Sequence, residues 1–210
     1  MLKPSTFFDY QNFEHKELFD SSENVWDIVK SLPSFINNLF ESGKIVGNYA
    51  PNVYVGQNVT IDPTAKIVGP AIIGDNCIIE HAAFIRENVI VGSGSKIGHA
   101  VELKQSVVLN NAAVSHLIYI GDSVVGNNVN VGGGTIFANW RFDAKNILIK
   151  NNEEKFDTGL VKFGAIVGDN SKIGVNVVLN PGTVLGKNCI VFPLESVLGV
   201  YDDNSRIHSS

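Results

Sequence analysis

Large hydrophobic residues recur at every sixth position through the first half of the chain. From Val55 to Leu103 this period is unbroken, and four positions after each large residue comes a small or β-branched one. A helical face repeats every three to four residues and a plain strand alternates every two, so a period of six predicts a coil of short strands. The large residues of this run are Val55, Ile61, Ile67, Ile73, Ile79, Ile85, Val91, Ile97 and Leu103. One large and one small inward residue in each repeat would fill a narrow prism.

The period continues toward the C-terminus with two repeats shortened by one residue and one interruption. It passes through Val108, Val114, Ile120, Val125, Val131 and Phe137, stops, and returns from Val161 to Val197. Glycine, Asp and Asn between these positions suit tight corners. We therefore predict an all-β fold, a left-handed parallel β-helix in which three six-residue repeats make one turn and stacked turns pair their strands. An ordinary β-sandwich, the alternative, would show alternation within strands and more varied loops.

The repeats divide the chain into five segments. Residues 1–45 lie outside them and are expected to form an N-terminal extension and helical cap over the open first turn, because the ends of repeat folds need covering. Ser22 is a plausible helix N-cap, and Pro33 is expected to break that helix before a second one ends near Gly43. The other segments are the first part of the β-helix at 46–137, a protruding loop or hairpin at 138–160, the last turns at 161–200 and a loose polar tail at 201–210. A long excursion from a regular coil is usually functional, although a purely structural hairpin is the alternative.

Composition narrows the possible partners. The formal net charge is −5 and no basic tract occurs, which argues against a nucleic-acid partner. No apolar run reaches the length of a membrane span and the N-terminus does not resemble a signal peptide, so we expect a cytoplasmic protein without a membrane partner. Cys77 and Cys189 both fall on the small inward position of their repeats, which indicates core packing rather than a disulfide, a metal ligand or a nucleophile.

Two cations are spaced by one full turn. Arg86 and Lys104 are eighteen residues apart, and each directly follows a large inward residue. They are expected to project from one side as a pair suited to the oxygens of a phosphate, since two aligned cations repel unless an anion lies between them. The alternative is a pair of surface charges that face acidic side chains, for which the candidates are Glu80, Glu87 and Glu102.

Three histidines also share one side. His81, His99 and His116 each fall two residues after a large inward position. This raises a zinc site of the gamma carbonic anhydrase type, but zinc needs ligands within about 2.1 Å and a vertical stack spreads them apart. We therefore predict no metal.

The sequence around His116 carries the most specific signal. The runs Gly98–Lys104, Ser115–Asp122 and Asn128–Ile136 resemble the acetyltransferase half of bacterial bifunctional N-acetylglucosamine-1-phosphate uridyltransferases, over about residues 80 to 145. The resemblance implies that His116 is the general base toward the amine of glucosamine-1-phosphate, an amino-sugar phosphate, and that acetyl-CoA is the co-substrate. It also implies that the sugar-phosphate contacts are Arg86, Lys104, Tyr119, Asn130 and Lys145, and that the cofactor contacts are Asn139, Trp140 and Asp169.

Departures from that family leave two readings open. Asn139-Trp140-Arg141-Phe142 replaces the family's Asn-Tyr-Asp-Gly, and no glycine-rich nucleotide loop precedes the repeats, so we expect no pyrophosphorylase activity.

Tyr119 and Asn130 would leave the prism from different sides, which together with the family's habit predicts a parallel homotrimer with sites between chains. The main alternative to the enzyme is a trimeric scaffold or regulatory protein that has lost turnover.

Overall fold

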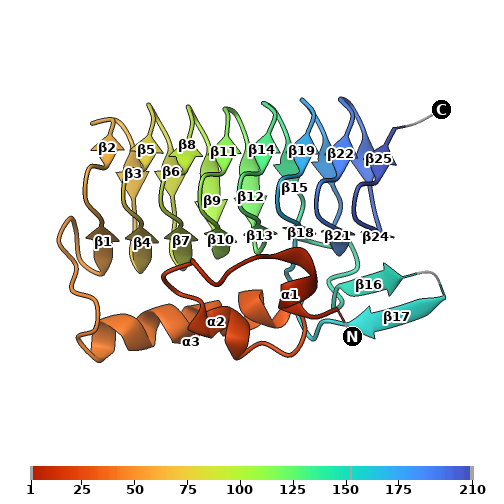
Figure 1. Cartoon of the computed structure of the whole chain (residues 1–210), viewed down its shortest axis with the longest axis horizontal. Helices are drawn as coiled ribbons and strands as arrows, with labels where there is room; N and C mark the ends of the chain where they lie inside the picture. The colour runs from red at the N-terminus through yellow and green to blue at the C-terminus, as the bar shows by residue number, and fades with distance from the viewer. Residues whose placement is uncertain (1, 152, 209–210) are drawn as a thin grey trace.

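The chain folds into a three-sided column of short parallel strands with a helical extension along one side (Figure 1). The computed structural model describes residues 2–151 and 153–208. Apart from the hairpin β16–β17 (Leu148–Asn151 and Glu154–Asp157), every third strand belongs to the same sheet, and all pairings within the three large sheets are parallel. This architecture confirms the predicted left-handed parallel β-helix.

Each side of the column is one sheet, named here sheet A, sheet B or sheet C. Sheet A contains β1 Val53–Val55, β4 Ala71–Ile73, β7 Val89–Val91, β10 Ser106–Val108, β13 Val124–Val125, β18 Ala165–Val167, β21 Thr183–Leu185 and β24 Val200–Tyr201. Sheet B contains β2 Thr60–Ile61, β5 Ile78–Ile79, β8 Lys96–Ile97, β11 Ala113–Val114, β14 Asn130–Val131, β19 Lys172–Ile173, β22 Ile190–Val191 and β25 Arg206–Ile207. Sheet C contains β3 Lys66–Ile67, β6 Phe84–Ile85, β9 Glu102–Lys104, β12 Tyr119–Gly121, β15 Ile136–Phe137, β20 Val178–Leu179 and β23 Ser196–Val197.

The period of six arises because one large residue of each repeat points into the column. Val53 pairs with Ala71, eighteen residues on, whereas Val107 pairs with Val124, seventeen residues on. The two shortened repeats are therefore confirmed, and they fall at Gln105 and Asp122, which close tight corners with positive φ. Cys77 and Cys189 are fully buried free thiols in the interior, as predicted.

The N-terminal extension lies along sheet A, so the predicted cap over the first turn is wrong. Its helices are α1 Pro4–Phe7, α2 Glu17–Asp20 and α3 Asp27–Glu41, and Figure 1 shows α3 running beside the sheet A strands, parallel to the column. Trp26, not Ser22, precedes α3, and Pro33 lies inside it without breaking it. A proline inside a helix costs about 3 kcal/mol. The buried face of α3 offsets this cost by packing on the apolar outer face of sheet A, and the contributing residues are Ile28, Val29, Leu32, Ile36, Ile72, Ile90, Val107, Val124, Ile166 and Val184.

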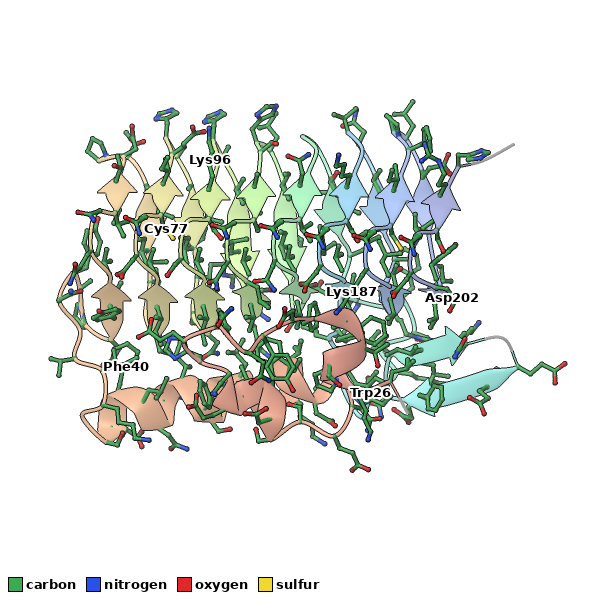
Figure 2. All side chains as sticks on the ribbon, in the orientation of Figure 1. Trp26, Phe40, Cys77, Lys96, Lys187 and Asp202 are labelled. Atoms are coloured by element: carbon green, nitrogen blue, oxygen red, sulfur yellow. The ribbon has the colours of Figure 1, made fainter. Side chains whose placement is uncertain are left out.

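The excursion between β15 and β18 forms an antiparallel hairpin. Its strands are β16 Leu148–Asn151 and β17 Glu154–Asp157. The hairpin contacts the N-terminal extension, where the ring centres of Trp26 and Phe156 are 5.9 Å apart. Figure 2 labels Trp26 beside the hairpin. Val161 is 40% exposed, so it is not an inward position of the coil, and the buried core resumes at Phe163.

The last residues also differ from expectation. β24 pairs with β21 and β25 pairs with β22, so residues 201–208 of the segment expected to be a loose tail instead continue the coil, and residues 209–210 lie outside the described residues. Tyr201 and Ile207 pack against the interior core. Among the described residues, no helix is both long enough and apolar enough to cross a membrane.

Candidate functional site

The corner between sheet C and sheet A brings Arg86 and Lys104 together. Ile85 pairs with Leu103, so the two cations that follow these residues lie on adjacent turns, about 4.8 Å apart along the column. The spacing argument from the sequence is thus correct about their alignment. By the same register, the positions above Lys104 on this corner are Gly121, Ala138, Asn180 and Leu198.

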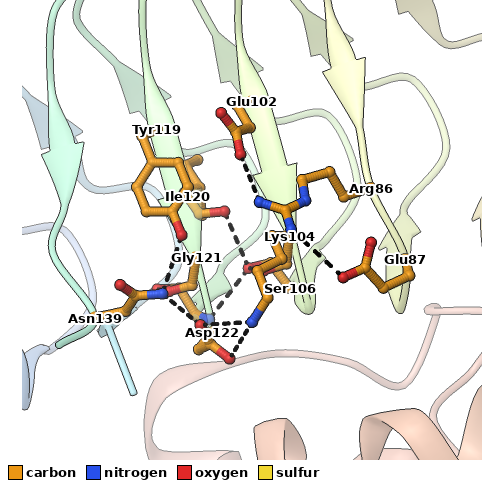
Figure 3. A network of polar contacts seen from close by, with 11 residues as sticks. Arg86, Glu87, Glu102, Lys104, Ser106, Tyr119, Ile120, Gly121, Asp122 and Asn139 are labelled. Atoms are coloured by element: carbon orange, nitrogen blue, oxygen red, sulfur yellow. Dashed lines mark hydrogen bonds and ion pairs between the residues drawn. The ribbon is translucent and has the colours of Figure 1, made fainter. Parts of the chain in front are cut away.

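Lys104 is held by a buried carboxylate. Its Nζ donates to Asp122 Oδ1 and Oδ2 at 3.2 and 3.3 Å, and the side chain of Asp122 is 1% exposed. The amide Nδ2 of Asn139 donates both to Asp122 Oδ2 and, at 3.0 Å, to the Tyr119 hydroxyl oxygen (Figure 3). Lys104, Asp122, Asn139 and Tyr119 therefore form one connected polar network.

Arg86 is paired with exposed acids on the same surface. Its Nη1 donates to Glu102 Oε1 at 3.0 Å, and its Nη2 lies 3.7 Å from Glu87 Oε1 (Figure 3). The reasoning that the two aligned cations lack aligned acids is therefore wrong, because each cation already has a carboxylate partner. Glu80, the third acid considered, pairs with Lys96 instead.

The network keeps the Tyr119 hydroxyl protonated. Burial raises the pKa of this phenol, and the nearby carboxylates of Asp122 and Glu102 raise it further, while Asn139 and Arg86 act in the opposite direction. Since the Tyr119 oxygen accepts from Asn139, its own O–H is left to act as a donor. Tyr119 thus presents a neutral hydrogen-bond donor.

His116 lies at a different corner, between sheet B and sheet C. It is exposed and rests against Gly133, where an added Cβ would lie 2.7 Å from the imidazole Cδ2 and 2.8 Å from Nε2. The Gly134 N–H donates to His116 O at 3.1 Å, which leaves the Gly133 N–H as the candidate donor to an oxyanion. The positive φ of Leu117, the next residue, recurs at Ala82 and Ala100 on the same corner, so it reflects the corner and not catalysis.

The structure does not bring His116 and the two cations into one crevice within a chain. Gly121 pairs with Lys104, and it lies five residues after His116 in the same turn. His116 precedes β12 and Gly121 ends it, so the two positions stand at opposite edges of sheet C, at ~3.3 Å per extended residue. Asn130 is exposed on sheet B, and Lys145 is exposed in the excursion. The predicted residues therefore occupy four regions of one chain.

An open hollow of about 460 Å³ continues the corner that carries Lys104. Its lining is Ala138, Trp140, Arg141, Phe142, Asp143, Leu148, Lys150, Asn180, Pro181 and Leu198. Trp140 is fixed by Lys162, whose Nζ lies 5.5 Å from the ring centre, and Phe142 is fully exposed on a turn held by the Arg141–Asp143 ion pair. Sequence reasoning missed most of this lining because the excursion separates Ala138 from Asn180 by 42 residues, although the period does continue through both.

Lys145 lines a neighbouring hollow of about 430 Å³ that shares Arg141 and Leu148 with the first. Asn146 and Asp157 complete its lining. The excursion thus places a cation beside an apolar groove.

Asp169 makes structural hydrogen bonds, and its assignment to the cofactor stays a prediction. Its side chain is buried at the corner between sheets A and B, where Oδ2 accepts from the Asp9 N–H and Oδ1 accepts from the Asn127 N–H, both at 2.7 Å. The bond from the Asp9 N–H attaches the N-terminal extension to the column.

The histidine column does not assemble metal ligands. The rings of His81 and His99 stack with centres 5.1 Å apart and planes within 8°, and His99 Nδ1 lies 3.0 Å from His81 O. Stacked rings direct their nitrogens side by side and not toward a common point. Within residues 2–151 and 153–208, no group of three His, Cys, Asp or Glu side chains is placed to hold a metal ion.

The fold and the two corner sites define a hexapeptide-repeat β-helix protein, and comparison with known proteins gives its relatives. Residues 67–153 match the family model of the GMPPB C-terminal domain. The chain is 47% identical over 81 residues to bifunctional protein GlmU of Methanococcus aeolicus, which covers 39% of this chain and 20% of that protein. With GlmU of Methanococcus maripaludis it shares 34% identity over 182 residues, or 85% of this chain and 44% of that protein.

A further relative is the bifunctional sugar-1-phosphate nucleotidylyltransferase/acetyltransferase of Sulfurisphaera tokodaii, 35% identical over 86 residues, which are 41% of this chain and 21% of that protein. Among solved structures, a point mutant of AntD, an N-acyltransferase from Bacillus cereus, aligns with a TM-score of 0.45 and 24% identity over 78% of this chain and 80% of that one. The chain spans about a fifth of the length of the first curated relatives it matches.

Proposed function

We propose that the chain is an N-acetyltransferase that moves an acetyl group from acetyl-CoA to the amine of an amino-sugar phosphate such as glucosamine-1-phosphate. The observation that carries the proposal is an exposed imidazole, His116, set against the glycine backbone at Gly133, within the range that matches the family model. Similarity to relatives named GlmU and sugar-1-phosphate nucleotidylyltransferase/acetyltransferase supports the substrate class.

In this reaction His116 is the general base. The amine nitrogen attacks the thioester carbon, the new C–N bond forms, and the imidazole accepts the proton that the nitrogen loses. The resulting oxyanion accepts a hydrogen bond from the Gly133 N–H. The C–S bond then breaks, and the protonated His116 returns the proton to the leaving thiolate of coenzyme A. An imidazole has an ordinary pKa near 6.5, which suits both proton transfers at neutral pH.

The acceptor phosphate is assigned to Arg86 and Lys104. Lys104 supplies a fixed ammonium, Arg86 a planar guanidinium, and the neutral Tyr119 hydroxyl donates to the sugar phosphate. Asn130 and Lys145 complete the set, both with exposed side chains.

The donor is assigned to the apolar hollow that Trp140 lines. Asn139 lies between Ala138 and Trp140, which both line this hollow, and its amide is held by the Asp122 carboxylate. Asp169 is left out because its carboxylate binds the N-terminal extension.

A complete site then requires more than one copy. His116, Asn130 and the Lys104 network lie on different parts of the column, and sheet A is covered by the N-terminal extension, so neighbouring columns would meet through sheets B and C. Exposed apolar residues at that side include Ile78, Leu117, Val175 and Leu194. A parallel homotrimer with three shared sites fits this distribution, and light scattering gives its mass.

Release of free thiol from acetyl-CoA in the presence of glucosamine-1-phosphate tests the activity. His116→Ala should abolish release while preserving the oligomer mass. His81→Ala, which removes an exposed histidine two turns away on the same corner, should retain it. Retained release by His116→Ala would exclude the histidine from the mechanism.

A non-catalytic scaffold is the second candidate, and the acid partners of both cations favour it. Calorimetry separates the two functions: a scaffold would bind neither coenzyme A nor glucosamine-1-phosphate.

A further inference from the structure

The two cations of the sheet C–sheet A corner are held in different ways. The side chains of Lys104 and Asp122 are 14% and 1% exposed, whereas those of Arg86 and Glu102 are 34% and 37% exposed. Asp122 is fixed further by its backbone, since its N–H donates to Lys104 O and the Gly164 N–H donates to its carbonyl oxygen. Lys104 is thus a fixed group, and Arg86 is free to exchange its partner.

Glu102 occupies the part of Arg86 that an anion would need. A guanidinium binds a phosphate best through two parallel N–H groups, and one of these, Nη1, already donates to Glu102 Oε1 at 3.0 Å. The ring of Phe84 lies 5.9 Å from the guanidinium carbon and covers one face of it. An anion that binds through both Nη groups must therefore replace Glu102 at Nη1, and at Nη2 it meets only the more distant Glu87, at 3.7 Å. Exposed ion pairs contribute little to stability, so the replacement is feasible.

We propose that Glu102 is a specificity-determining residue that competes with an incoming phosphate monoester for Arg86. The inference rests on the proposed function, because it takes the phosphate of that acceptor as the ligand. A phosphate ester carries about two negative charges at neutral pH and is favoured over a carboxylate by both cations together. A free carboxylate ligand carries the same charge as the Glu102 side chain. Because Glu102 is tethered beside Arg86, its effective concentration is higher, and it outcompetes the free carboxylate. The corner thus selects phosphate esters and rejects carboxylates.

Calorimetry on the full chain without coenzyme A measures this selectivity. Glucose-1-phosphate and glucuronate are suitable probes, because both are sugars of similar size and neither carries an amine that could be acetylated. The unmodified protein should bind glucose-1-phosphate at least about tenfold more tightly than glucuronate. Glu102→Gln keeps the side-chain shape and removes the charge, so the Kd of glucose-1-phosphate should fall about two- to fivefold, as the loss of one exposed competing charge implies. In this variant the ratio of the Kd of glucuronate to the Kd of glucose-1-phosphate should become smaller.

Two controls separate competition at Arg86 from a general effect of charge. Glu80→Gln makes the same change of charge in another exposed ion pair, that with Lys96 at 2.7 Å, and should leave both affinities unchanged. In an Arg86→Ala background, Glu102→Gln should no longer tighten binding, since the group for which Glu102 competes is gone.

Three results would overturn the inference. They are equal tightening by Glu80→Gln, tightening by Glu102→Gln that persists without Arg86, and unchanged or weaker glucose-1-phosphate binding by Glu102→Gln. Absence of glucose-1-phosphate binding by the unmodified protein would overturn it as well. Thiol release with glucosamine-1-phosphate decides the proposed function separately, so the two failures are distinguishable.

Discussion

Lys104 and Asp122 are eighteen residues apart in sequence, and the Lys104 ammonium contacts both oxygens of the Asp122 carboxylate within 3.3 Å. A buried pair of this kind is weak evidence of net stability, because desolvation of both charges offsets their attraction. Removal of one partner is different, since it leaves the other charge buried and unpaired. The pair therefore holds the geometry of the corner whether or not it stabilises the fold.

Asp122→Ala should destabilise the protein by about 3–5 kcal/mol, because it leaves the Lys104 charge and the Asn139 amide without their carboxylate. Urea unfolding followed by circular dichroism measures this change. Asp143→Ala is the matched control, since it breaks the exposed Arg141–Asp143 ion pair and should leave the urea midpoint nearly unchanged. Equal midpoints for the two variants would contradict the structural role of the buried pair.

Stability should depend on Tyr119 at alkaline pH. Burial and the nearby carboxylates raise the pKa of this phenol above its unfolded value of about 10. A raised pKa contributes stability that is fully present below the unfolded value and is lost as the pH rises through the folded value. As the pH rises above about 10, the free energy of unfolding of Tyr119→Phe in urea should therefore fall less than that of the unmodified protein. Tyr49→Phe, which alters an exposed tyrosine, should follow the unmodified protein.

The column was predictable because its interior repeats, whereas its coverings were not. Ile73 and Ile79 are placed by the period alone, but Ile72 and Ile90 face outward, and only the run of three apolar residues in several sheet A strands indicated that this face is covered. Pro33 is misleading for a similar reason, since local propensity is overridden by the packing of α3 on that face.

The sequence predicted that the two cations of the candidate site are aligned, but it did not predict their carboxylate partners. Spacing by eighteen placed Arg86 one turn before Lys104, and the same count from Lys104 leads to Asp122, which was not considered. Asp169 could not be placed, because its partner Asp9 comes from a segment without any repeat.

Asp169→Asn tests whether Asp169 acts in the fold or at the donor site. One carboxylate oxygen of Asp169 accepts from the Asp9 N–H and the other accepts from the Asn127 N–H. An amide has only one acceptor oxygen, so the variant loses one of these bonds. We expect the free energy of unfolding in urea to fall by about 1–3 kcal/mol. Hydrogen exchange of residues 5–12 should become faster, and the Michaelis constant for acetyl-CoA should stay unchanged. A raised Michaelis constant with unaltered exchange would return Asp169 to the donor site.

Gly133→Ala should lower the turnover number without unfolding the protein. The new methyl group would lie within 2.8 Å of the His116 ring, so the imidazole must move away from the glycine backbone. A displacement of about 1 Å at a reacting group can cost on the order of a hundredfold in rate, which we take as the upper limit. The Gly133 backbone is not in the left-handed region, and the other close neighbour of the methyl group is the His116 backbone oxygen at 3.3 Å, which requires a shift of only a few tenths of an ångström. Thiol release at saturating substrate gives the rate, and the thermal midpoint serves as the control. An unchanged turnover number would show that the position of His116 against Gly133 has no part in catalysis.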